Sequence, residues 1–126
     1  MKGTHHMKSF QIEVVNPKQE QAQLMSWADQ LDKGQKGKAA TPKLRFASYK
    51  VLHSMLTEKR MALLEYAANH QNLSIRQLAA ALDRDYKNVY DDVQRLMSLG
   101  LIEVQNATLY VPYDEIDIRK TLRVAA

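Results

Sequence analysis

The apolar positions between Ser74 and Val111 predict two short helices followed by a β-hairpin. The first helix begins after the N-cap residue Ser74, and its apolar residues recur with the i, i+3, i+4, i+7 spacing of a single helical face. These residues are Ile75, Leu78, Ala79 and Leu82. Asp83 and Arg84 interrupt the pattern, and Asp85 can cap a second helix. Because a helix of about two turns is not stable alone, the first helix needs the second as a packing partner.

The second helix, residues 85–99, has an apolar face and an opposite polar face. The apolar face consists of Tyr86, Val89, Val93, Leu96 and Met97, and the polar face of Lys87, Asn88, Asp91, Gln94, Arg95 and Ser98. Gly100 suits the left-handed position that ends a helix. The runs Ile102–Val104 and Leu109–Val111, on either side of Asn106–Thr108, predict a hairpin that ends at Pro112. Two helices and a hairpin in this order are typical of a winged helix-turn-helix.

The N-terminal part of the chain predicts a strand and a helix that extend the main domain. After a leader of residues 1–8, Phe10, Ile12 and Val14 alternate as in a strand. The helix over residues 18–33 carries an apolar stripe with too little local sequence to bury it. We expect this helix to dock on the main domain or, as we favour, to form a dimer. The residues expected at that contact are Leu24, Trp27, Ala28 and Leu31.

The sequence of residues 34–42 is typical of a polar linker. The winged helix-turn-helix domain is expected over residues 43–118. Leu44–Phe46 alternate and can pair with the first strand. A short helix should follow from Tyr49, although Val51 leaves a strand open, and Thr57 caps the next helix. A closing strand around Ile116 and Ile118 is expected before an unassigned tail, residues 119–126. The predicted fold class is α+β, mainly α with a small β component, and residues 9–42 form its N-terminal strand–helix extension.

Composition narrows the function classes only a little. The net charge is +4 with a pI of about 9.3, which is compatible with a polyanionic partner. Residues 33–60 carry a surplus of +7, whereas the rest of the chain sums to −3. This surplus indicates either a solvated linker with exposed helix ends or a surface that contacts phosphates. The absence of cysteine and of long apolar runs favours a cytoplasmic protein without disulfides or membrane spans.

The run LAAALDRDYKNVYDDVQRLMSLGLIE resembles the winged helix-turn-helix of MarR-like and ArsR-like transcriptional regulators. The pieces LTEKRMALLE, SIRQLAAALDRDYKNVYDDV, LGLIE and VPYDEI resemble more closely a family of small DNA-binding proteins from archaea and bacteria. This family includes antitoxins of the TumA type, each paired with a toxin. The resemblance covers residues 57–118 and implies a winged helix that regulates a promoter. Asp91 departs from the family, which tends to carry a basic residue there.

Base contacts are expected from the N-terminal half of the second helix, because the major groove of B-DNA admits one α-helix. Asn88 can pair bidentately with adenine, and Lys87 can donate to guanine. Asp91 can accept from a cytosine amino group, or Lys87 and Arg95 can neutralise it. Tyr90 lies on the flank as a further base-contact candidate, and Tyr86 is expected to pack inward. Ordinary exposed helical side chains would show the same pattern.

Phosphate contacts are expected around the start of the first helix, where free backbone N–H groups attract anions. The candidates there are Ser74, Arg76 and Gln77. Arg84 in the turn and Arg95 on the second helix are further candidates. A helix cap with surface arginines accounts for these residues equally well. The wing tip carries Asn106 and Thr108 without a cation, so its contact with DNA should be weak.

Two other function classes compete with DNA binding. An enzyme is disfavoured because no nucleophile–base pair or phosphate-binding loop is evident, and Asp91 and Asp92 diverge on a helix; no cofactor or metal is expected. A protein-binding module is the serious alternative, since winged helices can bind proteins through the same face. In its antitoxin form, such a module would neutralise a toxin encoded nearby, with or without binding double-stranded DNA as a homodimer.

Overall fold

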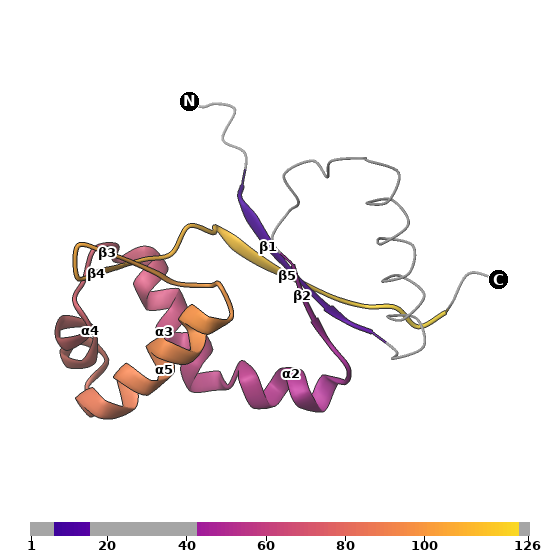
Figure 1. Cartoon of the computed structure of the whole chain (residues 1–126), viewed down its shortest axis with the longest axis horizontal. Coiled ribbons are helices and arrows are strands. Elements are labelled where there is room, and N and C mark those ends of the chain that lie inside the picture. The colour runs from indigo at the N-terminus through magenta and orange to yellow at the C-terminus, as the bar shows by residue number, and fades with distance from the viewer. Residues whose placement is uncertain (1–6, 16–42, 124–126) are drawn as a thin grey trace, which may run out of the picture. The chain divides into compact units, whose positions relative to one another are not determined.

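The computed structural model describes residues 7–15 and 43–123, which form a mixed α+β structure (Figure 1). The described residues divide into two compact units. The helical unit consists of residues 7–8 and 54–115, and the sheet unit consists of residues 9–15, 43–53 and 116–123. The α+β class predicted from the sequence is therefore confirmed.

The helical unit contains three helices followed by a hairpin. The helices are α3 (Glu58–Asn69), α4 (Ile75–Leu82) and α5 (Tyr86–Ser98), and the strands are β3 (Glu103–Gln105) and β4 (Thr108–Tyr110). Each helix begins at the predicted cap. The Thr57 side chain accepts from the Arg60 N–H, Ser74 forms a capping box with Gln77, and the Asp85 carboxylate accepts from the N–H groups of Lys87 and Asn88.

The hairpin turn is tighter than predicted. Thr108 belongs to β4, so Asn106 and Ala107 alone form the turn, with φ angles of 54° and 64°. Two consecutive positive φ angles are the pattern of a type I′ turn, in which glycine is favoured at the second position. The segment before α4 contacts the hairpin, since Leu73 forms an antiparallel β-bridge with Leu109. The Gln71 side chain also accepts from Val111 N and donates to Val111 O, both at 3.0 Å.

The core of the helical unit is built from the apolar faces that the sequence predicts. Leu78 and Ala79 of α4 are buried, as are Val89, Val93 and Leu96 of α5. Leu101, directly after Gly100 (φ 86°), is fully buried, as expected for the apolar residue that follows a helix-ending glycine. Further buried residues come from α3 and the hairpin: Leu63, Leu64, Ala67, Leu109 and Val111.

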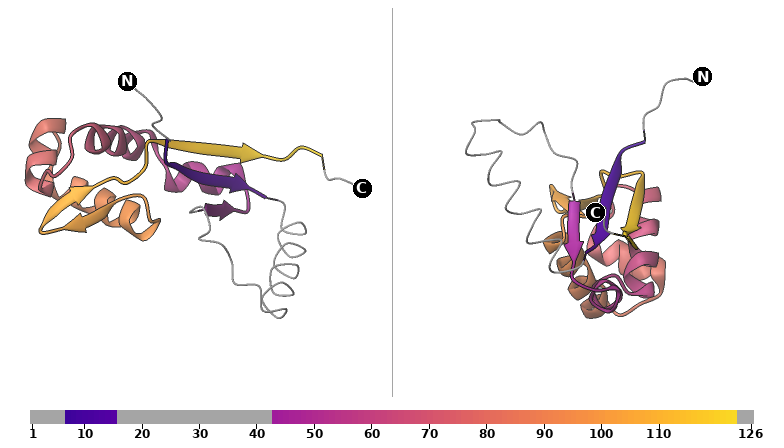
Figure 2. Two further views of the ribbon diagram at one scale, coloured as in Figure 1. Left: turned by 90° about the horizontal axis from the view of Figure 1, so that it is seen from above. Right: turned by 90° about the vertical axis from the view of Figure 1, so that its right-hand side faces the viewer.

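The sheet unit contains three strands in the order β2-β1-β5 (Figure 2). They are β1 (Ser9–Val14), β2 (Lys43–Phe46) and β5 (Glu115–Lys120), of which β5 begins in the helical unit. The predicted pairing of the first two strands is confirmed, and it is parallel, with Ile12 opposite Leu44. The side chains of Phe10, Ile12 and Val14 are buried. The segment after β2 is the helix α2 (Tyr49–Met55), which excludes the alternative of a strand at Val51.

The boundaries of the two units differ from the expected domain boundaries at residues 42 and 118. Residues 43–53 and 116–118 belong to the sheet unit, because β2 and β5 both flank β1. β5 also reaches Lys120, two residues into the expected tail. The predicted helix over residues 18–33 and the linker 34–42 lie outside the described residues. Within the described part of the chain, no helix is long and apolar enough to cross a bilayer.

We predict that Ala107→Gly stabilises the protein. A residue with a Cβ atom in the left-handed region is strained by about 1–2 kcal/mol, and the greater freedom of glycine in the unfolded chain offsets part of that relief. The expected gain is about 0.5–1 kcal/mol in the free energy of unfolding, measured by urea denaturation. Ala62→Gly in the exposed middle of α3 is the matched control, and it should destabilise by about 1 kcal/mol. Equal losses for both variants would contradict the assignment of strain to Ala107.

Candidate functional site

The side of α5 that faces away from its buried residues is the candidate site. We refer to Lys87, Asn88, Asp91, Gln94 and Arg95, all of them exposed, as the outer face of α5. The Asp85 carboxylate engages the backbone N–H groups of Lys87 and Asn88 at 3.1 and 3.4 Å and leaves their side chains in solvent. The predicted separation of α5 into a buried and an exposed side is therefore confirmed.

Tyr86 does not pack inward as predicted. Its side chain is 45% exposed, and Tyr90, one turn further, is 42% exposed. The buried side of α5 is centred on Val89, Val93 and Leu96, and at roughly 100° per residue Tyr86 lies about 60° from that centre. Tyr86 and Tyr90 therefore form an aromatic edge of α5, with their ring centroids 6.2 Å apart.

The start of α4 lies beside this aromatic edge. The Arg76 guanidinium is 5.4 Å from the centroid of the Tyr86 ring, a cation–π contact. Ser74 and Gln77, both predicted to contact phosphate, bind each other in the capping box: Ser74 N donates to Gln77 Oε1 at 2.9 Å, and Gln77 N to Ser74 Oγ at 3.1 Å. Arg76 is therefore the exposed, positively charged side chain at the start of α4.

Arg84, another predicted phosphate contact, is engaged inside the protein. Its Nη2 donates to Asp92 Oδ2 at 2.8 Å, and Arg60 Nε donates to Asp92 Oδ1 at 3.0 Å. The three side chains are only 13–20% exposed. Arg60 also donates through Nη1 to the carbonyl oxygens of Ser54 and Met55, whereas Arg84 Nη1 is buried without a partner. Asp92 thus joins α3 and the α4–α5 turn to α5, a structural role that the sequence analysis did not predict.

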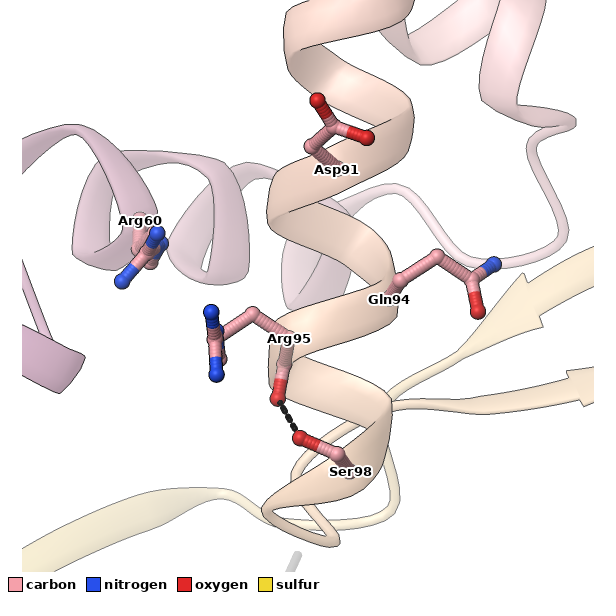
Figure 3. A pocket seen from close by; sticks show the side chains of 5 residues that line it. All are labelled: Arg60, Asp91, Gln94, Arg95 and Ser98. Carbon is pink, nitrogen blue, oxygen red and sulfur yellow. Dashed lines mark hydrogen bonds between the residues drawn. The ribbon is translucent and has the colours of Figure 1, made fainter.

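A pocket of about 580 Å³ lies along the other edge of α5 (Figure 3). It is lined by Arg60, Asp91, Gln94, Arg95 and Ser98. The Arg95 side chain extends from α5 toward the side on which Arg60 lies, while the Asp91 carboxylate points away from Arg60. Among the described residues, no ion pair reaches Asp91, so neither Lys87 nor Arg95 neutralises it by direct contact. Arg95 is exposed and lines the pocket.

The other predicted site residues lie at the hairpin, in the basic segment or outside the described residues. Asn106 is exposed at the hairpin tip, and the half-buried Thr108 donates its hydroxyl to Gln105 O at 2.8 Å. The dimerisation candidates Leu24, Trp27, Ala28 and Leu31 lie outside the described residues. Within the basic segment of residues 33–60, Lys43 and Arg45 form ion pairs with Glu13 at 3.5 and 3.4 Å. These ion pairs lower the positive charge that the segment can offer to a partner.

Titration and metal binding add no further site. The pKa of the Tyr113 hydroxyl is raised, because partial burial disfavours the phenolate and the nearby Glu103 carboxylate adds negative charge. Within residues 7–15 and 43–123, no group of three or more His, Cys, Asp and Glu side chains could hold a metal ion.

The comparisons with known proteins concern mainly the helical unit. A family model described as HVO_A0114 matches residues 55–118, about half of the chain. No curated protein and no solved structure matches the chain. The matched segment runs from the end of α2 through the hairpin and into β5, and so contains the outer face, the aromatic edge and the Asp92 ion pairs.

We predict that Asp92→Asn lowers the free energy of unfolding by about 2–3 kcal/mol. Loss of the carboxylate leaves Arg60 and Arg84, both mostly buried, without their counter-charge, and removing one partner of a fully buried ion pair costs about 3–5 kcal/mol. Asp91→Asn is the matched control: it is adjacent, exposed and without an ion pair, and its effect should stay within about 0.5 kcal/mol. Urea denaturation measures both, and equal effects would refute the structural role of Asp92.

Proposed function

The chain belongs to the HVO_A0114 family, and we propose that the matched segment binds double-stranded DNA as a winged helix-turn-helix. In this proposal the protein is a dimeric transcriptional regulator that represses a promoter, and α5 enters the major groove. The observation that carries the proposal is the outer face of α5, where Lys87 and Asn88 are exposed and have backbone contacts only. A groove about 12 Å wide accommodates one helix presented in this way.

The order of the elements supports this proposal. α3, α4 and α5 are followed by the β3–β4 hairpin, and the turn between α4 and α5 consists of Asp83, Arg84 and Asp85 alone. Asp83 adopts the left-handed conformation (φ 53°), which reverses the chain sharply after α4. This is the layout expected from the resemblance to MarR-like and ArsR-like regulators, in which the second helix of the pair reads the groove.

The phosphate contacts would come from two cations on opposite edges of α5. Arg76 lies over Tyr86 on the aromatic edge, and Arg95 lines the pocket along the opposite edge. Two cations that flank a helix in the groove are suitably placed for the two strands of the duplex, because phosphate contacts fix the register of a protein on DNA. Arg84 is left out of this set, since its guanidinium is paired with Asp92.

The charge of the segment argues for a dimer. Residues 55–118 carry six Lys and Arg against ten Asp and Glu, so one copy offers few phosphate contacts. Phosphate neutralisation supplies most of the sequence-independent affinity. Two copies on successive half-sites would double the phosphate contacts.

A second candidate function is favoured by the same charge balance. A net acidic segment with exposed Tyr86, Tyr90 and Val104 is also suited to a basic protein partner. The resemblance to TumA-type antitoxins points to a toxin encoded nearby. In this version the chain neutralises that toxin, with or without contact to DNA.

We predict that the double variant Arg76→Ala, Arg95→Ala binds the DNA upstream of its own gene more weakly and with a flatter salt dependence. Each lost phosphate contact should reduce the slope of log K against log[salt] by about 0.9. Fluorescence anisotropy between about 50 and 200 mM salt measures this slope, and the stoichiometry at saturation reports the dimer. The control Arg119→Ala, Lys120→Ala removes the same charge from exposed positions of β5. An unchanged slope in the first variant would refute the phosphate role.

For the second candidate, we predict that the product of the neighbouring gene co-purifies with this chain after co-expression. The complex should survive about 0.5 M salt if apolar contacts at the aromatic edge carry it, because screening weakens exposed charge pairs but not apolar burial. Gel shifts of the upstream DNA with and without that partner separate the two functions. Failure of the two proteins to associate at low salt would eliminate the antitoxin version.

A further inference from the structure

The aromatic edge of α5 is an apolar surface that the fold leaves uncovered. Tyr86 and Tyr90 are 45% and 42% exposed, and their rings meet at an interplanar angle of 34°. Together with Lys87 and Asp91, the two rings line a notch of about 280 Å³. The cation and the carboxylate cancel in charge, so the notch does not attract phosphate. It instead offers two ring faces to an apolar group.

The Tyr86 ring has neighbours on both α4 and the hairpin. Arg76 lies 5.4 Å from the Tyr86 centroid, which ties that ring to the start of α4. On the hairpin side, Tyr86 and Arg76 line a second pocket, of about 560 Å³, with Gln94, Val104 and Ala107. Tyr86 therefore lies next to the two elements that, beside α5, would meet the duplex: the start of α4 and the hairpin.

We propose that Tyr86 and Tyr90 read thymine methyl groups in the major groove, so that the operator of this protein carries A·T pairs opposite the first two turns of α5. The inference rests on the proposed function. The thymine 5-methyl is the apolar group that the major groove presents among hydrogen-bond donors and acceptors. Two exposed tyrosine rings at the N-terminal end of a groove-binding helix offer apolar faces that can cover that group. The ring faces carry the contact, and the hydroxyl groups are not required for it.

The test compares the same upstream duplex containing thymine or deoxyuridine. Uracil keeps every hydrogen-bonding atom of thymine and lacks only the methyl group. Each methyl group that the tyrosines cover should contribute about fourfold in affinity, which corresponds to about 0.8 kcal/mol for a buried CH₂ group. We expect the unmodified protein to bind the deoxyuridine duplex about 4- to 16-fold more weakly, measured by anisotropy at one salt concentration.

Variants assign the effect to the tyrosines. Tyr86→Ala with Tyr90→Ala should bind both duplexes equally, whereas Tyr86→Phe with Tyr90→Phe should keep the preference for thymine. Tyr49→Ala is the matched control, since Tyr49 is 55% exposed on α2 and should leave the preference intact. Far-UV circular dichroism verifies that each variant is folded, and exposed positions should change stability little.

Each outcome decides a different point. Equal binding of thymine and deoxyuridine duplexes by the unmodified protein would overturn methyl readout and leave DNA binding in place. Binding to neither duplex would overturn the proposed function itself. If the double alanine variant keeps the preference for thymine but loses a co-purifying protein, the aromatic edge belongs to a protein interface and the proposal is overturned.

Discussion

The Asp92 carboxylate fixes the geometry on which the candidate site depends. Its two oxygens accept from Arg60 at the start of α3 and from Arg84 in the α4–α5 turn, so three segments meet at one side chain of α5. Apolar burial of Val89, Val93 and Leu96 determines which side of α5 faces the core and which side stays exposed. The ion pairs of Asp92 add directional contacts that hold α5 in this orientation.

Much of the helical unit could be predicted because its signals are local. Thr57, Ser74 and Asp85 cap helices through side chains that act within three residues, and Gly100 ends α5 through its own backbone. Asp92 could not be predicted in this way, because its partners lie on α3 and in the α4–α5 turn. The exposure of Tyr86 was not predicted because it lies at the edge of the apolar face, where periodicity alone separates buried from exposed positions poorly. Arg60 lies 32 residues from Asp92, and no spacing rule links the two. A charged residue close to an apolar stripe, such as Asp92 beside Val93, is the signal that could have indicated a buried partner.

Charge divides the chain in a way that bears on both proposed functions. The segment that matches the family is net acidic, whereas residues outside it carry twelve Lys and Arg against four Asp and Glu. Arg60 and Arg84 are neutralised by Asp92, and Lys43 and Arg45 share Glu13. In the proposed complex with DNA, the matched segment would therefore supply few phosphate contacts, chiefly from Arg76 and Arg95. Shape and apolar contacts at α5 would then contribute much of the choice of sequence.

The strand order β2-β1-β5 determines when the sheet unit can fold during synthesis. β1 pairs with β2 about 30 residues later and lies beside β5, which begins at Glu115. The sheet unit therefore needs strands that lie far apart in sequence, while α3, α4, α5 and the hairpin form from residues close together. Contacts between distant residues form slowly, and N-terminal segments leave the ribosome first. The helical unit can consequently fold before β5 is available to β1, and the sheet around Phe10, Ile12 and Val14 is completed only after β5 has been synthesised.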